Sequence, residues 1–403
     1  MDMDALLYKA AKEGHFDTLN QYECHKLEVH FSPNNNTILH VAAQFGCAEF
    51  VTKILEGCPS LACHRPNIIG DSAFHVAVRQ GYTSLAHAIL ECTKRLDREL
   101  ESGVTVTKEL LRATNQVGDT ALHMAMRIGS DVVKMVKLLI QEDLEFQYPP
   151  NNALETPLYI AAERGLVKVM EECLKNCTSL AVGGPCGRTV LHGAVIGTNS
   201  RLGKKSECTK LLLEADHKYG IDLIKVKDAY GWTALHYAAR NGHSDIAASL
   251  LEVDKSAAYI GTENDNNTPL HLAAAAGKVD VISKLLFFSP ACCEIVNKKG
   301  QNVLHVAMDM EQQDVIECIR KLSIWRLLLN QKDNDGNTPF HLLAKKGNIK
   351  RQLTDKLPIG DEVFNNENLT PWQLQLGEDE PLSRLQKSDI SSSEKEKLTT
   401  QLN

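Results

Sequence analysis

The fold is decided by a stretch in the middle of the chain, Gly231-Trp232-Thr233-Ala234-Leu235-His236-Tyr237-Ala238-Ala239-Arg240-Asn241-Gly242. A threonine that can cap a helix is followed by apolar residues and small alanines along one helical stripe. The closing glycine stands where a left-handed residue would end the helix. The stretch therefore predicts one short amphipathic helix with defined ends.

The same pattern recurs along the chain. Its core, Thr-x-Leu-His-x-Ala in the most regular copies, begins at Thr37, Ser72, Thr120, Thr156, Thr189, Thr233, Thr268, Asn302, Thr338 and Thr370. Seven of the nine intervals between copies are 32 to 36 residues long, and the other two are 48 and 44. A period of this length is typical of stacked supersecondary units.

Each copy predicts a pair of helices. Pro157, Pro269 and Pro339 stand at the first helical position, where no backbone donor is needed. The closing glycine recurs six residues after the histidine position, at Gly46, Gly81, Gly129, Gly165, Gly242, Gly277 and Gly347. A second amphipathic segment follows, such as residues 132–140. Because one such pair cannot bury its apolar face alone, we expect the pairs to stack into a solenoid.

The repeated pattern resembles the ankyrin repeat, whose signature is G-x-T-P-L-H-x-A-A-x-x-G. Besides residues 231–242, residues 267–274 match it closely. The resemblance implies an all-α solenoid of about ten helix-turn-helix units with short β-hairpin-like loops, spread over residues 1–380. We expect units to start near residues 4, 36, 71, 119, 155, 188, 232, 267, 301 and 337, with a terminal half-unit at 369. The polar residues 381–403 are predicted to form a disordered tail.

Three stretches carry a narrower resemblance. Residues 4–14, 155–165 and 302–308 are similar to those of the plant ankyrin proteins of the accelerated-cell-death type. Members of that family carry an ankyrin array followed by a membrane domain, called the PGG domain, and are linked to defence and cell-death signalling. After Trp372, where that membrane domain would begin, the sequence is polar, so we expect the resemblance to be to the ankyrin part alone.

These resemblances imply a non-enzymatic scaffold or adaptor that binds another protein, in plant defence or cell-death signalling. An alternative is a soluble or truncated regulatory form of an ankyrin-transmembrane protein that associates with full-length membrane relatives. The net charge of −7 gives no electrostatic basis for nucleic-acid binding. No apolar run reaches the length that a membrane span needs. We expect a cytoplasmic protein that reaches the plasma membrane only through partners.

The twelve cysteines are scattered and form no C-x-x-C pair. In a cytosolic chain such thiols stay reduced, so we expect core residues without a disulfide framework or a zinc site.

Three irregularities interrupt the period. The 48-residue interval contains residues 93–117, for which we expect an extended second helix before a loop. The 44-residue interval contains residues 198–206, expected as a solvated basic loop; its glycines do not have the spacing of a phosphate-binding loop. Glu311 replaces a closing glycine, so we expect the turn there to differ.

The histidine of the pattern argues against catalysis. It stands at the same place in most copies, at His40, His75, His123, His192, His236, His271, His305 and His341. A catalytic residue is needed once, whereas a structural one is needed in every unit. We expect each histidine to hydrogen-bond near its helix start and to tether neighbouring loops, with Tyr8 and Tyr159 as substitutes. No enzyme activity, cofactor or metal is predicted.

The surface that the pattern leaves free contains the two residues before each closing glycine. Ankyrin arrays usually bind through these positions and the loop tips. The predicted partner-binding residues are Phe45, Arg79, Arg127, Ile128, Arg164, Ile196, Trp232, Arg240, Lys345 and Lys346. The paired positions carry seven positive and three negative charges. We predict an acidic or phosphorylated protein partner on this concave face, against the alternative of a merely solvated face. Trp232 either contacts a partner or packs against the adjacent loop.

Overall fold

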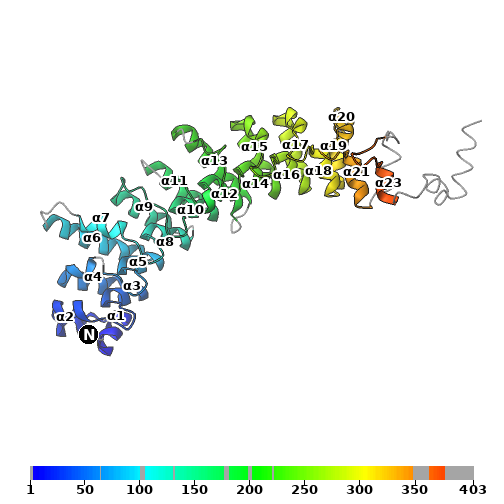
Figure 1. The fold of residues 1–403 in the computed structure, drawn as a ribbon. Helices are drawn as coiled ribbons and strands as arrows, with labels where there is room; N and C mark the ends of the chain where they lie inside the picture. The colour runs from blue at the N-terminus through cyan, green and yellow to red at the C-terminus, as the bar shows by residue number, and fades with distance from the viewer. Residues whose placement is uncertain are drawn as a thin grey trace, which may run out of the picture. The chain divides into compact units, whose positions relative to one another are not determined.

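The computed structural model describes residues 3–63, 65–99, 105–129, 132–176, 181–197, 202–219, 222–347 and 363–376. The predicted tail, residues 381–403, lies outside these ranges. By its internal contacts the chain divides into two blocks, Met1–Ala234 and Leu235–Asn403. Each block is built from an inner and an outer row of helices (Figure 1).

In the first block the inner helices are short, and each packs against the next. They are α1 (Ala5–Glu13), α3 (Ile38–Phe45), α5 (Ala73–Arg79), α8 (Ala121–Ile128), α10 (Pro157–Arg164) and α12 (Val190–Ile196). The outer row consists of α4 (Ala48–Gly57), α6 (Thr83–Glu99), α9 (Val133–Glu142), α11 (Val167–Asn176) and α13 (Leu202–Tyr219). Each outer helix packs on the inner helix before it and on the next outer helix.

Short elements fill the corners of the first block. They are η1 (Phe16–Gln21), α2 (Cys24–Val29), η2 (Pro59–Ala62), α7 (Val106–Arg112) and η4 (Pro185–Gly187). The predicted extension of the helix in the 48-residue interval is confirmed, because α6 is 17 residues long. The interval also holds α7, which packs on α6 and α9 and which the sequence analysis did not predict.

The second block repeats this plan. Helix α14 (Ala234–Asn241) begins at the boundary, and the inner helices that follow are α16 (Pro269–Ala275), α18 (Val303–Asp309), α21 (Pro339–Lys345) and α23 (Pro371–Leu376). The outer elements are α15 (Ser244–Val253), η5 (Lys255–Tyr259), α17 (Val279–Phe288), η6 (Pro290–Glu294), α19 (Gln313–Arg320) and α20 (Trp325–Asn330). The terminal helix α23 closes the core by placing Trp372 edge-on to Phe340, with ring centroids 6.1 Å apart.

The core lies between the two rows of helices. Leu39 and the small residues Ala42 and Ala43 of α3 are fully buried, as are Phe50 and Val51 of α4. The alanines let neighbouring inner helices approach closely, while each large side chain contributes about 1.5–3 kcal/mol through the area it removes from water. The same pattern recurs in every repeat, so burial accumulates along the stack.

The helix starts follow the predicted caps. Thr37, Ser72, Thr120, Thr189, Thr268, Asn302 and Thr338 each form a reciprocal capping box with the histidine three residues later. Pro157, Pro269 and Pro339 occupy the first turn. The interactions satisfy backbone amides that would otherwise lack a partner at the helix start.

The closing glycines are left-handed at all but one of the predicted positions. Gly46, Gly81, Gly165, Gly242, Gly277 and Gly347 have φ between 68° and 79°. Gly129 differs, with φ 132° and ψ −156°, so the prediction is wrong there. Helix α9 starts four positions after Gly129, whereas α11 starts two positions after Gly165. The longer connection lets the chain leave α8 in an extended conformation.

The turn at Glu311 corrects a second expectation. Glu311 has φ 54°, and its amide donates to the Met308 carbonyl at 3.2 Å while the Gln312 amide donates to Ala307 at 2.9 Å. Gly277 and Lys278 make the same pair of bonds. The turn is therefore the same as elsewhere, and the surrounding helix pair holds the non-glycine residue in the left-handed region at a cost of about 1–2 kcal/mol.

The basic segment of the 44-residue interval corrects a third expectation. Helix α13 begins at Leu202, so residues 202–206 are helical and not a loop; residues 198–201 lie outside the described ranges. Lys205 is 8% exposed, and its Nζ donates to the Val195 carbonyl at 3.5 Å. Burial lowers the pKa of Lys205. The lysine is buried because α13 packs directly on α12, which leaves no room for a solvated loop.

One pair of cysteines departs from the expected reduced core. Cys24 and Cys58 form a disulfide, with Cα atoms 5.4 Å apart and a separation of 34 positions in the sequence. This separation equals one repeat, so stacking brings the two positions together. The other described cysteines are free, and Cys92, Cys173, Cys208, Cys292 and Cys293 are buried as predicted.

The histidines link each repeat to the next. The Thr37 amide donates to His40 Nδ1 at 3.2 Å, and His40 Nε2 donates to the Asp71 carbonyl at 2.9 Å. Because a backbone amide only donates and a carbonyl only accepts, the ring is the neutral tautomer protonated on Nε2. The other seven histidines donate to the carbonyls of Ala113, Glu155, Trp232, Asn267, Gln301, Asn337 and Leu369 at 2.9 to 3.2 Å. The predicted tethering by histidine is confirmed.

The two tyrosines at this position behave differently from each other. Tyr8 is 40% exposed and therefore does not act as the predicted buried tether. Tyr159 is buried, and the next repeat makes room for its ring with two glycines: a Cβ on Gly184 would lie 2.2 Å from Tyr159 Cδ2, and one on Gly193 would lie 3.0 Å from Cε2. Tyr159 also forms a side-chain hydrogen bond with Arg188 of the next repeat, as the predicted tether requires. Thr156 adds a second contact to that loop, since its hydroxyl donates to the Gly183 carbonyl at 2.8 Å.

Buried neutral histidines make the stability depend on pH. Burial lowers the pKa of His271 from 6.5 to about 4, and it also lowers the pKa values of His123, His192, His305 and His341. Below pH 6.5 the unfolded chain binds protons that the folded chain does not, so the free energy of unfolding decreases as the pH falls toward 4. For His271 alone the decrease is about 3 kcal/mol.

The substitution His271→Gln tests this pH dependence, because glutamine does not titrate. In urea denaturation, the difference in free energy of unfolding between wild type and His271→Gln should become smaller as the pH is lowered from 7.5 to 5. A difference that stays constant would contradict a buried neutral His271.

Adjacent glycines give a matched test of the Tyr159 packing. Gly184→Ala should lower the free energy of unfolding by about 2 kcal/mol, because its methyl group overlaps the tyrosine ring. Gly183→Ala should be neutral or slightly stabilising, since nothing lies within 4 Å of a Cβ there. Adding Tyr159→His to Gly184→Ala should restore most of the loss. Equal effects of the two glycine substitutions in urea denaturation would show that the ring does not constrain this loop.

Candidate partner-binding surface

Seven of the described loops between repeats are each organised by one asparagine or aspartate. Asn115 Oδ1 accepts from the amides of Val117 at 3.1 Å and Asp119 at 2.9 Å, and Gly118 takes the left-handed conformation with φ 78°. Equivalent pairs of bonds are made by Asn67, Asn151, Asp228, Asn297, Asp333 and Asn365. This Asx turn closes each loop into the hairpin-like shape that the sequence predicted.

Neighbouring loops are joined through their backbones. In the first block the Gln116 amide donates to the Ile69 carbonyl at 3.1 Å, and the Asn152 amide donates to Val117 at 3.0 Å. In the second block the Asn334 amide donates to Lys299 at 3.0 Å in the same way. The loop tips are thus held in a row, and their outward side chains have a defined backbone position.

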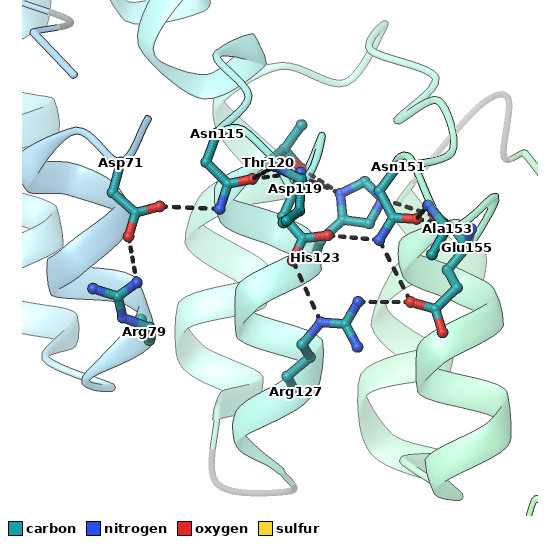
Figure 2. A network of polar contacts seen from close by, with 11 residues as sticks. Asp71, Arg79, Asn115, Asp119, Thr120, His123, Arg127, Asn151, Ala153 and Glu155 are labelled. Carbon is teal, nitrogen blue, oxygen red and sulfur yellow. Dashed lines mark hydrogen bonds and ion pairs between the residues drawn. The ribbon is translucent and has the colours of Figure 1, made fainter. Parts of the chain in front are cut away.

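Two of the predicted basic residues, Arg79 and Arg127, form ion pairs with acidic side chains of this chain. Figure 2 shows Arg79 contacting Asp71, whose side chain is fully buried. Asp71 also accepts from Asn115 Nδ2 at 3.0 Å. Arg127 contacts two acids: its Nε lies 3.4 Å from Asp119 Oδ2, and its Nη2 donates to Glu155 Oε2 at 2.6 Å.

The acids change the charge of the predicted surface. The predicted positions carry seven positive and three negative charges, and Asp71, Asp119 and Glu155 directly beneath them reduce the balance to +1. Glu163, one of the negative positions, is half-buried, and burial followed by the nearby Glu155 charge raises its pKa. The first block therefore presents little net positive charge to a partner.

The remaining basic positions are less uniform than predicted. Arg164 is half-buried, and its Nε has no hydrogen-bond partner among the described residues. Arg240 and Lys345 are exposed. Lys346 is also exposed, and its Nζ lies 3.4 Å from Asp309. Lys345 and Lys346 thus place exposed positive charge at the end of α21 in the second block.

The predicted apolar contacts are exposed to different degrees. Phe45 is 42% exposed, with Lys12 Nζ 5.4 Å from its ring centroid, and Ile128 is 39% exposed. Ile196 and Trp232 are half-buried. The Trp232 backbone is held between Asp228 and His192, with bonds of 3.0 and 2.9 Å.

Sequence reasoning pointed to the loop tips but did not predict five exposed apolar residues on them. Ile68, Ile69, Val117, Leu154 and Tyr230 are 46% to 57% exposed in the first block. They follow the organising asparagine or aspartate by one to three residues, which is a signal that was available in the sequence.

A hollow of about 250 Å³ lies beside the first of these tips. Apolar surface is supplied by Tyr8, Phe45 and Ile69, and amide groups by Asn34 and Gln44.

Among the described residues, no group of three or more His, Cys, Asp or Glu side chains could hold a metal ion. The described helices also include none that is both long and apolar enough to cross a bilayer.

Comparison with known proteins agrees with this architecture. A family model described as ankyrin repeats (3 copies) matches residues 100–178, 170–260 and 256–324, which is more than half of the chain. The chain belongs to the ankyrin-repeat family. Ankyrin repeats are in general a non-enzymatic fold that mediates protein–protein binding.

Curated relatives share the ankyrin array at low identity. Protein ACCELERATED CELL DEATH 6 of Arabidopsis thaliana is 26% identical over 59% of this chain and 32% of its own length. The Homo sapiens transient receptor potential cation channel subfamily A member 1 is 24% identical over 86% of this chain and 32% of its own length. Palmitoyltransferase AKR1 of Lachancea kluyveri is 26% identical over 59% of this chain and 29% of its own length. The ankyrin-repeat chain thus spans about a third of each relative.

The role of the Arg127 network can be measured against an exposed lysine. Arg127→Met should lower the free energy of unfolding by about 1 kcal/mol, because Asp119 and Glu155 lose their cation while solvent screens part of the effect. Lys345→Met should change it by less than about 0.5 kcal/mol. Urea denaturation of both variants measures these free energies of unfolding. Equal values for the two variants would mean that Arg127 does not stabilise the fold and is available to bind a partner.

Proposed function

We propose that this ankyrin-repeat protein is a non-enzymatic scaffold or adaptor that binds another protein. The observation that supports this proposal is that each repeat has two sets of residues, one that holds the stack together and one that is exposed to solvent. The polar side chains at the helix starts and loop bases are engaged in hydrogen bonds with neighbouring repeats, while the loop tips and inner-helix ends remain exposed. A row of tips with defined backbone positions loses little conformational entropy when it binds a partner.

The pathway is proposed as plant defence or cell-death signalling. Its support is the likeness to Protein ACCELERATED CELL DEATH 6 over 250 residues at 26% identity. A role in this pathway requires that loss of the gene changes the extent of pathogen-induced cell death in its native plant.

An acidic or phosphorylated partner segment is proposed for the second block. Lys345 is exposed there at the end of helix α21, whereas Arg79 and Arg127 of the first block are bound by acids. Electrostatic attraction of this kind weakens as salt is added, since exposed charges are screened beyond about 8–10 Å.

Affinity capture from native tissue tests the scaffold function. The full chain should retain a discrete protein that then binds the purified chain saturably. Reversing Arg240 and Lys345 to Glu should weaken capture at low salt if the contact is acidic, with Lys284→Glu on the outer helix α17 as the matched control. Failure to obtain any saturable protein complex would refute the proposed function.

The identity of the captured protein separates two forms of the proposal. A protein without an ankyrin array fits the adaptor. Capture of a longer ankyrin relative with membrane helices fits the alternative, in which the chain acts as a regulatory form that associates with such relatives and sits at the plasma membrane through them. The observation that favours this second candidate is that the chain aligns with only about a third of each curated relative.

A further inference from the structure

The exposed loop tips of the first block are free of charge. They are formed by Ile68 and Ile69, Gln116 and Val117, residues 152–154, Pro185 and Cys186, and Ala229 and Tyr230. None of these residues is Asp, Glu, Lys or Arg. Ile68, Val117, Leu154 and Tyr230 are each more than half exposed. Such a concentration of exposed apolar side chains on one row marks an interaction surface.

The corresponding tips of the second block are charged. The places of Ile69 and Val117 are taken there by Lys299, Asp335 and Glu367. The backbone is the same in both blocks, since Gly70 and Gly300 have φ values of 80° and 74°. The loop therefore accepts charged residues at these places, and the apolar tips of the first block are not required by the fold.

Hydrogen bonds hold the apolar tips in position. The Ile68 amide donates to the Asn34 carbonyl at 3.1 Å, and the Gln116 side chain donates to the Ile68 carbonyl at 2.6 Å. The Asn152 side chain donates in turn to the Gln116 carbonyl at 3.0 Å. The tips cannot fold inward to hide their side chains, so they stay available for a partner.

The hollow beside Ile69 indicates what the partner inserts. Its apolar lining from Tyr8, Phe45 and Ile69 suits one large aliphatic or aromatic side chain, and the amides of Asn34 and Gln44 can pair with the peptide groups on either side of it. The cation at its rim, Arg79, is already bound by the buried Asp71. The lining therefore offers an acidic side chain or a phosphate only a cation that already has an acidic partner, and Lys12 outside the lining lies over the Phe45 ring.

We infer that the tip row of the first block binds an extended, uncharged segment of a partner protein that is rich in aliphatic and aromatic residues. One of its side chains occupies the hollow between Phe45 and Ile69, and others lie on Val117 and Leu154. The inference rests on the proposed scaffold function and adds the chemistry of the partner. A protein segment is favoured over a lipid surface because the hollow is concave and the tips carry no basic residue to attract anionic headgroups.

Selection of peptides by the full chain tests the inference. Random peptides displayed on phage are selected on immobilised protein, and the enriched sequences are synthesised and titrated against three forms of it. These are wild type, the double variant Ile69→Lys and Val117→Lys, and the control Lys299→Ile. The double variant places at both tips the lysine that the second block carries at Lys299, so it preserves the loop backbone.

The expected result has three parts. Enriched peptides are uncharged and rich in Leu, Ile, Val or Phe. The double variant binds them at least about tenfold more weakly, because two apolar contacts are lost, while Lys299→Ile binds them as wild type does. Raising the salt concentration changes the wild-type affinity by less than about twofold, since no exposed ion pairs are involved.

Other outcomes overturn the inference. Enrichment of acidic peptides, or equal affinity of wild type and double variant, would place recognition elsewhere on the chain and leave the scaffold function standing. Failure to enrich any peptide would rule out the uncharged peptide as the occupant. A separate sedimentation experiment with phosphatidylcholine vesicles then tests the lipid alternative. Sedimentation of the chain with the vesicles would assign the tips to lipid. The outcome of the affinity capture from tissue does not depend on these results, so the scaffold function and the chemistry of the partner segment are tested separately.

Discussion

The bond from each histidine Nε2 to a carbonyl of the next repeat is the interaction on which the rest of the structure depends. His40, for example, closes its own helix start through Nδ1 and reaches Asp71 through Nε2. One side chain thereby joins a local cap to the stacking of repeats. Because the ring is buried and must stay neutral to do both, the same contact that builds the stack also makes it sensitive to acid. Stacking then brings together residues one period apart, such as Cys24 and Cys58.

This tether leaves little polar chemistry for other purposes. The threonine, the histidine and the loop asparagine of a repeat all bond to backbone or to the neighbouring loop, and Asp71 and Asp119 hold Arg79 and Arg127. The tip residues and the ends of the inner helices remain exposed, on a backbone that they do not determine. Such a surface suits the proposed binding function, since a binding residue needs exposure and position but no perturbed proton affinity.

Local signals in the sequence were sufficient to predict the helix pairs, their caps and the role of the histidines. Relations between residues of different repeats were harder to infer. Arg79 and Arg127 each stand eight residues after an acid that precedes the cap, and this spacing was visible, but it has meaning only once the helix start folds the acid back under the arginine. The room that Gly184 makes for Tyr159 crosses between repeats and could not be predicted from either one alone. Glu311 misled for the opposite reason, because tertiary packing overrode its local preference.

The loop tips suit the proposed recognition because the repeat accepts both apolar and charged residues there. The glycine that comes next has the same left-handed conformation whether the residue before it is Ile69, Val117, Lys299 or Asp335. A substitution there changes what the surface attracts and leaves the stack intact. Apolar tips in one block and charged tips in the other therefore amount to two different chemical requirements on whatever the chain binds. A partner that satisfies both has an uncharged apolar segment and a charged segment, each able to lie along a row of tips.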